Sequence, residues 1–262
     1  MERKLGILSE CLKGVSAEET LPLIKKAGFD CYFTGHYTSE KVASIKKVGD
    51  ELGLTCEFIH APFKGINNMW LSGMDYMEVD RQMKESIDTA AEHGIPTVIC
   101  HLSSGWKAPE INDLGLARFD ALVEYATDRK VNIAFENLRK IGNLAYFADR
   151  YEFMPYVGFC YDIGHEHCYT KTVDWMDIFL NKMIATHIHD NMGRGDAKDC
   201  DPDLHLLPFD GNVDYEHVMR KLDQYGFEGA LVLEVGNSRH LHLSHEEFLQ
   251  TCYERILKIS KM

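Results

Sequence analysis

The feature of this sequence that most constrains its fold is a regular alternation of short apolar runs with segments of helical periodicity. The eight runs are rich in Val, Ile, Phe and Tyr and lie at residues 4–9, 29–35, 54–60, 96–101, 131–137, 157–162, 183–190 and 230–235. Runs this short and apolar are typical of strands covered on both faces. The pattern therefore indicates a parallel sheet with a helix after each strand.

Capping signals mark several of the helices. Ser16 with Glu19 and Ser244 with Glu247 have the spacing of capping boxes, and Gly28 follows the first helical pattern as a C-terminal stop. Further helices are predicted over about residues 39–52, 75–94 and 112–129, and the last reaches Lys258. Helices and strands thus alternate to the end of the chain.

Eight such units in 262 residues favour a single (β/α)8 TIM barrel, for which ~250 residues is usual. An open doubly wound sheet is the alternative, but the residues after the first strand, SECLKGVSAEE, contain no G-x-G-x-x-G fingerprint. No linker or low-complexity segment interrupts the pattern. We therefore expect one α/β domain over residues 1–262.

The charge balance limits the classes of partner. The formal net charge is −13 and Lys and Arg form no cluster, whereas a nucleic-acid partner normally requires a basic face. No apolar run approaches the ~20 residues of a membrane span, and the first residues lack the apolar segment of a signal peptide. The cysteines show no C-x-x-C pair, which indicates reduced thiols. We expect a cytoplasmic protein with neither nucleic-acid nor membrane partners.

Metal-capable side chains end six consecutive strands. They are His60, His101, Glu136, Asp162, His187 and Glu234. In a barrel these strand ends form the active-site face, so the side chains converge although they lie far apart in sequence. Taken alone, a strand-end histidine is more often hydrogen-bonded or exposed than a ligand. Glu136 and Glu234, however, stand in apolar runs, where a carboxylate is costly to bury unless it is paired or bound to a cation.

Neighbouring residues enlarge this group. His165 follows Asp162 by three positions, and His187 and His189 share one face of their strand because strand side chains alternate. Asp203 and His205 lie together in the loop that follows. We expect these side chains to reach the same centre.

The ligand types predict a divalent metal ion. The set Glu136, Asp162, His187 and Glu234 is rich in oxygen, which suits Mn²⁺, Zn²⁺, Co²⁺ or Mg²⁺. The additional metal or substrate ligands are His60, His101, His165, Asp203 and His205, which would supply enough nitrogen and oxygen atoms for two or three zinc ions.

In order along the chain, the motifs resemble those of the xylose-isomerase-like (β/α)8 barrels, which include sugar phosphate isomerases/epimerases, ketose 3-epimerases, inosose dehydratases and endonuclease IV. The strings are HAPF, VICHLSSG, AFENLR, GFCYDIGHEH, THIHDN, DLHLLPFDGNVDY and LVLEVGN, and the resemblance covers nearly the whole chain. It implies that Glu136, Asp162, His187 and Glu234 bind a catalytic divalent ion. It also implies that His165 contacts substrate.

The same resemblance leaves a nuclease open, because all nine positions that match the trinuclear zinc ligands of endonuclease IV are present. Charge separates the two hypotheses. The expected mouth loops carry the basic residues Lys64, Lys107, Arg139, Arg194, Lys198 and Arg239 against the acidic residues Asp190, Asp196, Asp199, Asp201 and Asp210. A DNA duplex would be repelled by this mixture.

We therefore expect a metal-dependent sugar or sugar-phosphate isomerase/epimerase that acts on a small-molecule carbohydrate through an enediolate. Glu136 and Glu234 would exchange the proton, with His165 assisting. Trp70 and Trp106 are expected to form apolar walls for the sugar, and residues 191–202 a lid that carries Arg194 as a substrate contact. A cyclitol dehydratase, or a barrel that binds a carbohydrate without turnover, is a further alternative, and a homo-oligomer is compatible with the sequence.

Overall fold

A computed structural model describes residues 3–170, 173–179, 182–194 and 203–262. The strands are β1 (Leu5–Leu8), β2 (Cys31–Thr34), β3 (Thr55–His60), β4 (Thr97–Cys100), β5 (Asn132–Glu136), β6 (Val157–Asp162), β7 (Met183–His187) and β8 (Leu231–Leu233). The helices are α1 (Ala17–Ala27), α2 (Ser39–Glu51), α3 (Tyr76–His93), α4 (Asp113–Asp128), α5 (Ile141–Arg150), α6 (Ile163–Tyr169), α7 (Trp175–Phe179), α8 (Tyr215–Gln224) and α9 (His245–Ile259), with 3-10 turns η1 (Ile66–Trp70) and η3 (Asn237–Arg239).

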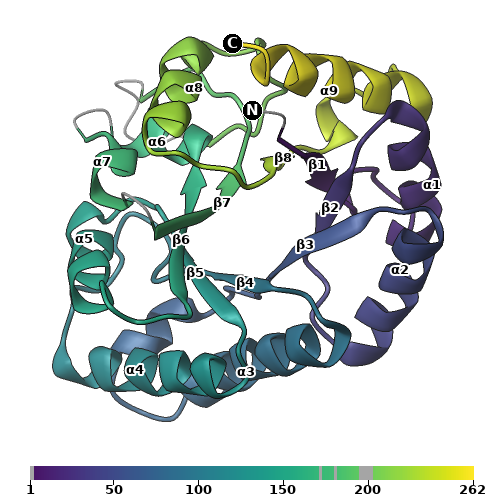
Figure 1. The fold of residues 1–262 in the computed structure, drawn as a ribbon. Helices are drawn as coiled ribbons and strands as arrows, with labels where there is room; N and C mark the ends of the chain where they lie inside the picture. Colours follow the sequence, from purple (N-terminus) through teal and green to yellow (C-terminus); the bar gives the residue numbers. More distant parts are fainter. Residues whose placement is uncertain (1–2, 171–172, 180–181, 195–202) are drawn as a thin grey trace.

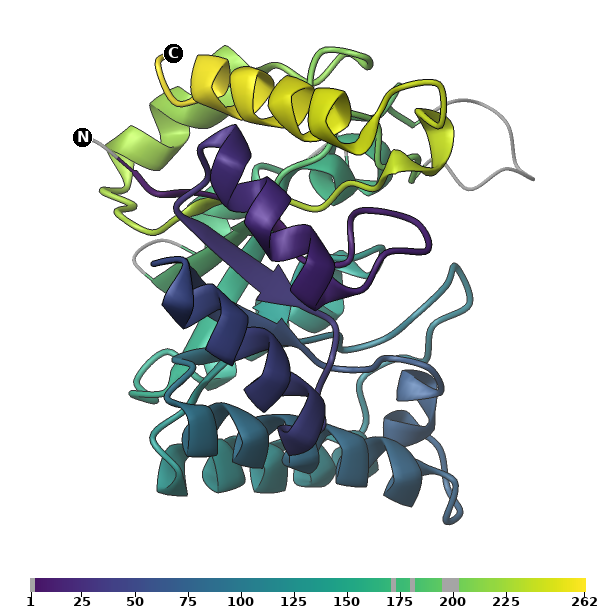
Figure 2. The same cartoon turned by 90° about the vertical axis from the view of Figure 1, so that its right-hand side faces the viewer.

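The strands form one parallel sheet in the order β7-β6-β5-β4-β3-β2-β1-β8, which curves into a ring with the helices outside it (Figure 1). Viewed from the side, the helices run along the outside of the strands (Figure 2). The predicted (β/α)8 TIM barrel is confirmed. Both capping boxes are present at the helices that the sequence assigned to them, α1 and α9.

The ring closes between β7 and β8 with few backbone contacts. Ile188 and Leu233 form an isolated parallel bridge, and the Ile188 amide donates to the Val232 carbonyl at 2.8 Å. The Thr186 hydroxyl donates to the Ala230 carbonyl and accepts from the Val232 amide. A buried side chain thus supplies hydrogen bonds that a longer β8 would provide through its backbone.

The apolar core of the protein consists of two clusters. The larger lies between the strands and the surrounding helices. The smaller one, drawn from β2 to β8, comprises Phe33, Phe58, Ile99, Ala134, Cys160, Ala185 and Val232 and fills the interior of the ring. Because large residues on β2 and β3 face small ones on β5 to β7, this layer leaves no open channel.

No helix in the described part of the chain combines the length and apolar character of a membrane span. The cysteines within it form no disulfide, as expected for reduced thiols, while Cys200 lies outside the described residues.

Gly115 in α4 offers a test of packing outside the barrel. A Cβ atom there would lie 2.0 Å from Cε3 of Trp70, whereas at Gly142 in α5 a Cβ would meet nothing within 4 Å. Gly115→Ala is therefore expected to lower the free energy of unfolding by about 1–3 kcal/mol through overpacking. Gly142→Ala, the matched control, is expected to raise it by up to about 1 kcal/mol through helix propensity. Urea unfolding measures both, and equal effects would contradict the close packing of Trp70 on α4.

Candidate functional site

The six strand-end residues predicted from the sequence come together at the carboxyl end of the barrel. Each stands two positions after a residue of the interior apolar cluster: Phe58 and His60, Ile99 and His101, Ala134 and Glu136, Cys160 and Asp162, Ala185 and His187, Val232 and Glu234. Side chains two apart in a strand share a face, so they form the next layer toward the carboxyl end. The barrel itself thus assembles the site.

Glu136 is the centre of this layer and is buried. Its carboxylate lies 2.9 Å from His101 Nε2, 3.4 Å from His60 Nε2, 3.2 Å from His165 Nδ1 and 3.3 Å from His187 Nδ1. Burial alone would raise the pKa of Glu136, but the nearby imidazoles outweigh it and hold the pKa well below the ordinary value. Glu136 is therefore an ionised carboxylate that accepts hydrogen bonds from imidazoles on several sides.

Three carboxylates share one side of this layer. One oxygen each of Glu136, Asp162 and Glu234, and one nitrogen of His187, lie within 4.8 Å of one another. Glu136 and Asp162 are almost fully buried, and the Glu234 side chain is 19% exposed. Carboxylates this close repel one another unless a cation lies between them. The donor set, three carboxylates and an imidazole, fits a divalent ion such as Mn²⁺ or Zn²⁺.

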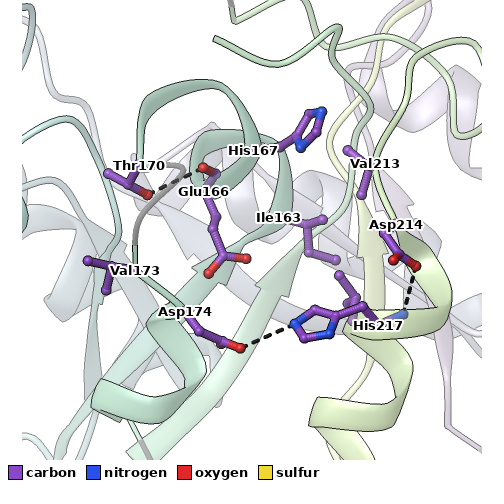
Figure 3. Close-up of a pocket in the computed structure, with 10 residues that line it drawn as sticks. Ile163, Glu166, His167, Thr170, Val173, Asp174, Val213, Asp214 and His217 are labelled. Atoms are coloured by element: carbon purple, nitrogen blue, oxygen red, sulfur yellow. Dashed lines mark hydrogen bonds and ion pairs between the residues drawn. The ribbon is translucent and has the colours of Figure 1, made fainter.

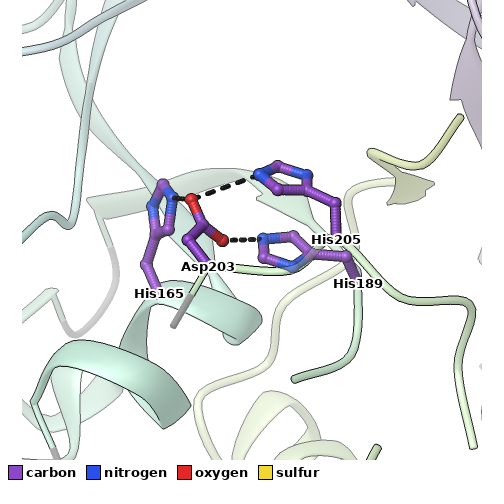
Figure 4. Close-up of side chains that lie close together, drawn as sticks. All are labelled: His165, His189, Asp203 and His205. Atoms are coloured by element: carbon purple, nitrogen blue, oxygen red, sulfur yellow. Dashed lines mark hydrogen bonds and ion pairs between the residues drawn. The ribbon is translucent and has the colours of Figure 1, made fainter. Parts of the chain in front are cut away.

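A second group of ligand-type side chains comprises His165, His189, Asp203 and His205 (Figure 4). It adjoins the first group through the contacts of His165 with Glu136 and of His189 with Asp162. His165 Nε2 and His205 Nε2 lie 3.1 and 3.3 Å from Oδ2 of Asp203, and His189 Nε2 lies 3.9 Å from its Oδ1. Burial lowers the pKa of His205, but the hydrogen bond to Asp203 and the charges of Glu234 and Asp203 outweigh it and raise the pKa to about 10. This group can hold a cation or bind substrate hydroxyls.

The loop that carries Asp203 and His205 is fixed by Asp190, which is buried immediately after β7. The Asp190 carboxylate accepts the backbone N–H groups of Asn191, Phe209 and Val213 at 2.8, 2.8 and 3.1 Å. Asp190 also exchanges two backbone hydrogen bonds with Leu206. A carboxylate that accepts three amides holds its loop strongly, so residues 206–213 are anchored to Asp190.

A pocket of about 240 Å³ opens over both groups. Its lining residues are His60, Phe63, His101, Ser103, Ser104, Glu136, Leu138, Arg139, His165, Asp203, His205 and Glu234. The floor is ionic and the walls add two hydroxyls and two apolar side chains. This mixture suits a small polyhydroxylated ligand.

Aromatic and arginine side chains lie beside this pocket. The Arg139 guanidinium lies 3.9 Å from the ring centre of Tyr169 and 5.2 Å from that of Trp106. Arg194 lies 5.6 Å from the ring centre of Trp106 and contacts the Tyr169 carbonyl at 3.5 Å. Trp106 is half exposed and is joined to the pocket through Arg139. Residues 195–202, most of the predicted lid, lie outside the described residues.

Trp70 does not lie where the sequence analysis expected it. Its ring is buried against Phe119 and Phe147, and Nε1 donates to the Leu102 carbonyl. The expected sugar wall is therefore part of the core between η1 and α4. The reason is Gly115, which leaves room for an indole on the helix surface.

Several pocket residues were missed by the sequence analysis. Phe63 stacks on His101 with ring centres 4.2 Å apart, and Ser103 and Ser104 follow His101 closely. Proximity in sequence to a predicted ligand was the available signal for all three. His189 was expected near the site but without a role, and its contacts depend on the folded path of α6.

The fold and its ligand groups define a metal-capable (β/α)8 barrel of the kind that acts on small molecules at its carboxyl face. Residues 21–252 match the sequence profile of the xylose isomerase-like TIM barrel family, and the chain belongs to this family. It is 28% identical to the uncharacterized protein y4fM of Sinorhizobium fredii, over 93% of this chain and 88% of that protein.

Two solved structures share the fold. A D-tagatose 3-epimerase-like protein is 20% identical, with a TM-score of 0.76 and 98% of each chain covered. A D-allulose 3-epimerase from Methylomonas sp. is 14% identical, with a TM-score of 0.74 and 98% of each chain covered.

A separate pocket of about 490 Å³ lies on the other side of α6 (Figure 3). Glu166 accepts hydrogen bonds there from the Tyr161 hydroxyl and the Trp175 amide. Asp174 pairs with His217 at 3.2 Å. None of these lies in the ligand groups described above. Burial is the main cause that raises the pKa of Glu166 to about 7, against the two hydrogen bonds.

The raised pKa of Glu166 predicts a pH effect on stability. A folded-state pKa of about 7 against an ordinary 4.5 means that the folded protein holds a proton that the unfolded chain has lost. The stability from this proton is complete below about pH 4.5 and is lost as the pH rises through 7. Between pH 5 and 8, the free energy of unfolding of the wild type is expected to fall by about 2–3 kcal/mol relative to that of Glu166→Gln. Denaturant unfolding across this range measures the difference, and a constant difference would contradict the prediction.

Proposed function

We propose that this protein is a divalent-metal-dependent isomerase or epimerase of a small ketose or ketose phosphate. The observation that carries the proposal is the placement of Glu136 and Glu234 in one pocket, together with the ligand group that they share with Asp162 and His187. The family and the epimerases that share the fold agree with this chemistry.

Glu136, Asp162, His187 and Glu234 would hold the ion. When bound, the ion would polarise the ketose carbonyl and stabilise negative charge that develops as the neighbouring proton leaves. Glu136 and Glu234 come from β5 and from the residue after β8, so they reach a substrate from different sides of the ring. In the proposal, one carboxylate removes the proton and the other returns it to the opposite face, as general base and general acid.

The remaining pocket residues position the sugar. The Asp203 carboxylate, held between His165 and His205, would accept hydrogen bonds from sugar hydroxyls. Phe63 and Leu138 offer apolar surface to C–H faces, and Trp106 and Arg194 would complete the mouth. The pocket is small and enclosed by protein on several sides, as a monosaccharide requires.

The carboxylate roles predict a specific loss of proton exchange. Glu136→Gln and Glu234→Gln are each expected to lower deuterium incorporation from D₂O into a ketose by at least about 100-fold, because each removes a proton-transfer group. The measurement is proton NMR of deuterium incorporation into a panel of ketoses, including D-tagatose and D-allulose, in the presence of the Mn²⁺-loaded protein. Glu78→Gln, on the outer face of α3, is the control and should exchange like wild type. Normal exchange by either pocket variant would refute its role.

A second candidate function is zinc-dependent hydrolysis of a phosphodiester, as in the endonuclease hypothesis. The observation in its favour is that ligand-type atoms form adjoining groups, including His60 with His101 and Glu136, and His165 with Asp203 and His205. Two or three closely placed ions would suit displacement at phosphorus.

Metal content and substrate choice separate the two candidates. We expect one tightly bound divalent ion per chain by elemental analysis and no cleavage of a duplex that contains an abasic site, because the formal charge of −13 opposes DNA binding. Three zinc ions per chain together with cleavage would establish the second candidate and overturn the first.

A further inference from the structure

We infer that His189 is a positioning residue that ties the two ligand groups together: it orients Asp162 through a hydrogen bond and His205 through ring stacking. The consequence of this role for catalysis rests on the proposed function. The contacts themselves do not depend on the identity of the sugar.

The contact with Asp162 is short and buried. His189 Nε2 lies 3.0 Å from Oδ1 and 3.1 Å from Oδ2 of Asp162, and both side chains have 0% exposure. Because a carboxylate that binds a divalent ion is deprotonated and only accepts, His189 donates through Nε2. Asp162 Oδ1 also accepts the His165 backbone amide at 2.6 Å, so His189 and the start of α6 together fix this carboxylate. One of its oxygens lies within 4.8 Å of ligand atoms of Glu136, His187 and Glu234.

The contact with His205 is a parallel stack. The two ring centres lie 3.9 Å apart and the planes are inclined by 10°. His205 lies in a loop and adopts a left-handed backbone conformation with φ of 45°, which a side chain other than glycine adopts only where its surroundings hold it. The His189 ring supplies one such constraint, and the His205 Nδ1 contact with the Glu234 carbonyl at 2.8 Å supplies another.

The surroundings of His189 leave its ring little freedom. A Cβ atom on Gly164 would lie 2.0 Å from His189 Cε1, so the first turn of α6 passes directly over the imidazole. Asn191 Nδ2 donates to the Gly164 carbonyl at 3.1 Å and lies 3.4 Å from His189 Nδ1, while Asn191 Oδ1 accepts the Leu204 amide. Asn191 therefore locks His189 to α6 and to the residue between Asp203 and His205.

Two substitutions separate the two contacts. His189→Phe keeps an aromatic ring beside His205 and removes the donor to Asp162. His189→Gln keeps an N–H donor near the position of Nε2 and removes the ring. If His189 served packing alone, the two substitutions would affect Asp162 and His205 alike, because either one would disturb the same packing.

The Asp162 contact is tested by Co²⁺ binding to the full-length, metal-depleted protein, followed by titration calorimetry. Loss of a partner that orients a ligand typically weakens metal affinity by about 10–100-fold, so this loss is expected for His189→Phe. His189→Gln should stay within about threefold of wild type. His217→Gln, in α8 and lining the separate pocket beyond α6, is the matched control and should equal wild type. In a protein that already carries Asp162→Asn, His189→Phe should weaken Co²⁺ affinity further by less than about threefold.

The His205 contact is tested by proton NMR without metal or substrate. The His205 ring signals, identified by their loss in His205→Ala, should lie upfield in wild type and His189→Phe because of the stacked ring. They should move downfield in His189→Gln. Thermal unfolding of each variant establishes that the comparison is made between folded proteins.

Each outcome decides a separate question. Equal Co²⁺ affinity for wild type and His189→Phe, equal losses for the two variants, or unchanged His205 signals would overturn the role of His189. The predicted differences in a protein that exchanges no ketose proton would refute the proposed function and leave this role intact. A wild-type protein that binds no Co²⁺ would overturn both.

Discussion

The structure depends on the alternation of side chains along eight parallel strands. Once Ala134, Cys160 and Ala185 face the axis, Glu136, Asp162 and His187 must face it too, one layer nearer the carboxyl ends. A shift of one residue in any strand would turn its ligand toward the helices and bury a charge in apolar surroundings. Packing of the interior and assembly of the site are therefore consequences of a single register.

The charges gathered by this register explain the rest of the site. Buried carboxylates cannot remain ionised beside one another without compensation, and the structure provides it from imidazoles on every side of Glu136. Burial lowers the pKa of His165, but Asp162, Asp203 and Glu136 outweigh it and hold the pKa well above the ordinary value. Protons and a bound divalent ion would therefore compete for the same oxygen and nitrogen atoms. Metal binding would release protons from the histidines, so such a site binds cations more tightly as the pH rises.

The sequence was sufficient for the barrel and for the convergence of strand-end ligands because both follow from short-range periodicity. Six candidate ligand residues could be placed because each occupies the end of a strand, and a strand end has a fixed location in this fold. Trp70 could not be placed, because its burial depends on a glycine 45 positions later in α4. The contacts of His189 were equally inaccessible, since they require the first turn of α6 and the loop at Asp203 to meet above one imidazole. Local pattern determines elements, whereas side-chain partners arise from tertiary packing.

The residue types of the candidate site suit both sugar chemistry and phosphodiester chemistry, so the approach to the site carries the distinction. A duplex requires an open, positively charged approach, because phosphate contacts supply most of its binding energy. Here Arg139 lies against Tyr169 and Trp106, and Arg194 lies beside the same Trp106 ring. The Arg139 guanidinium, packed on these aromatic rings, lines a pocket of about 240 Å³. Under the proposed function, that arrangement would suit a compact ligand with a polar edge and an apolar face, as a monosaccharide has.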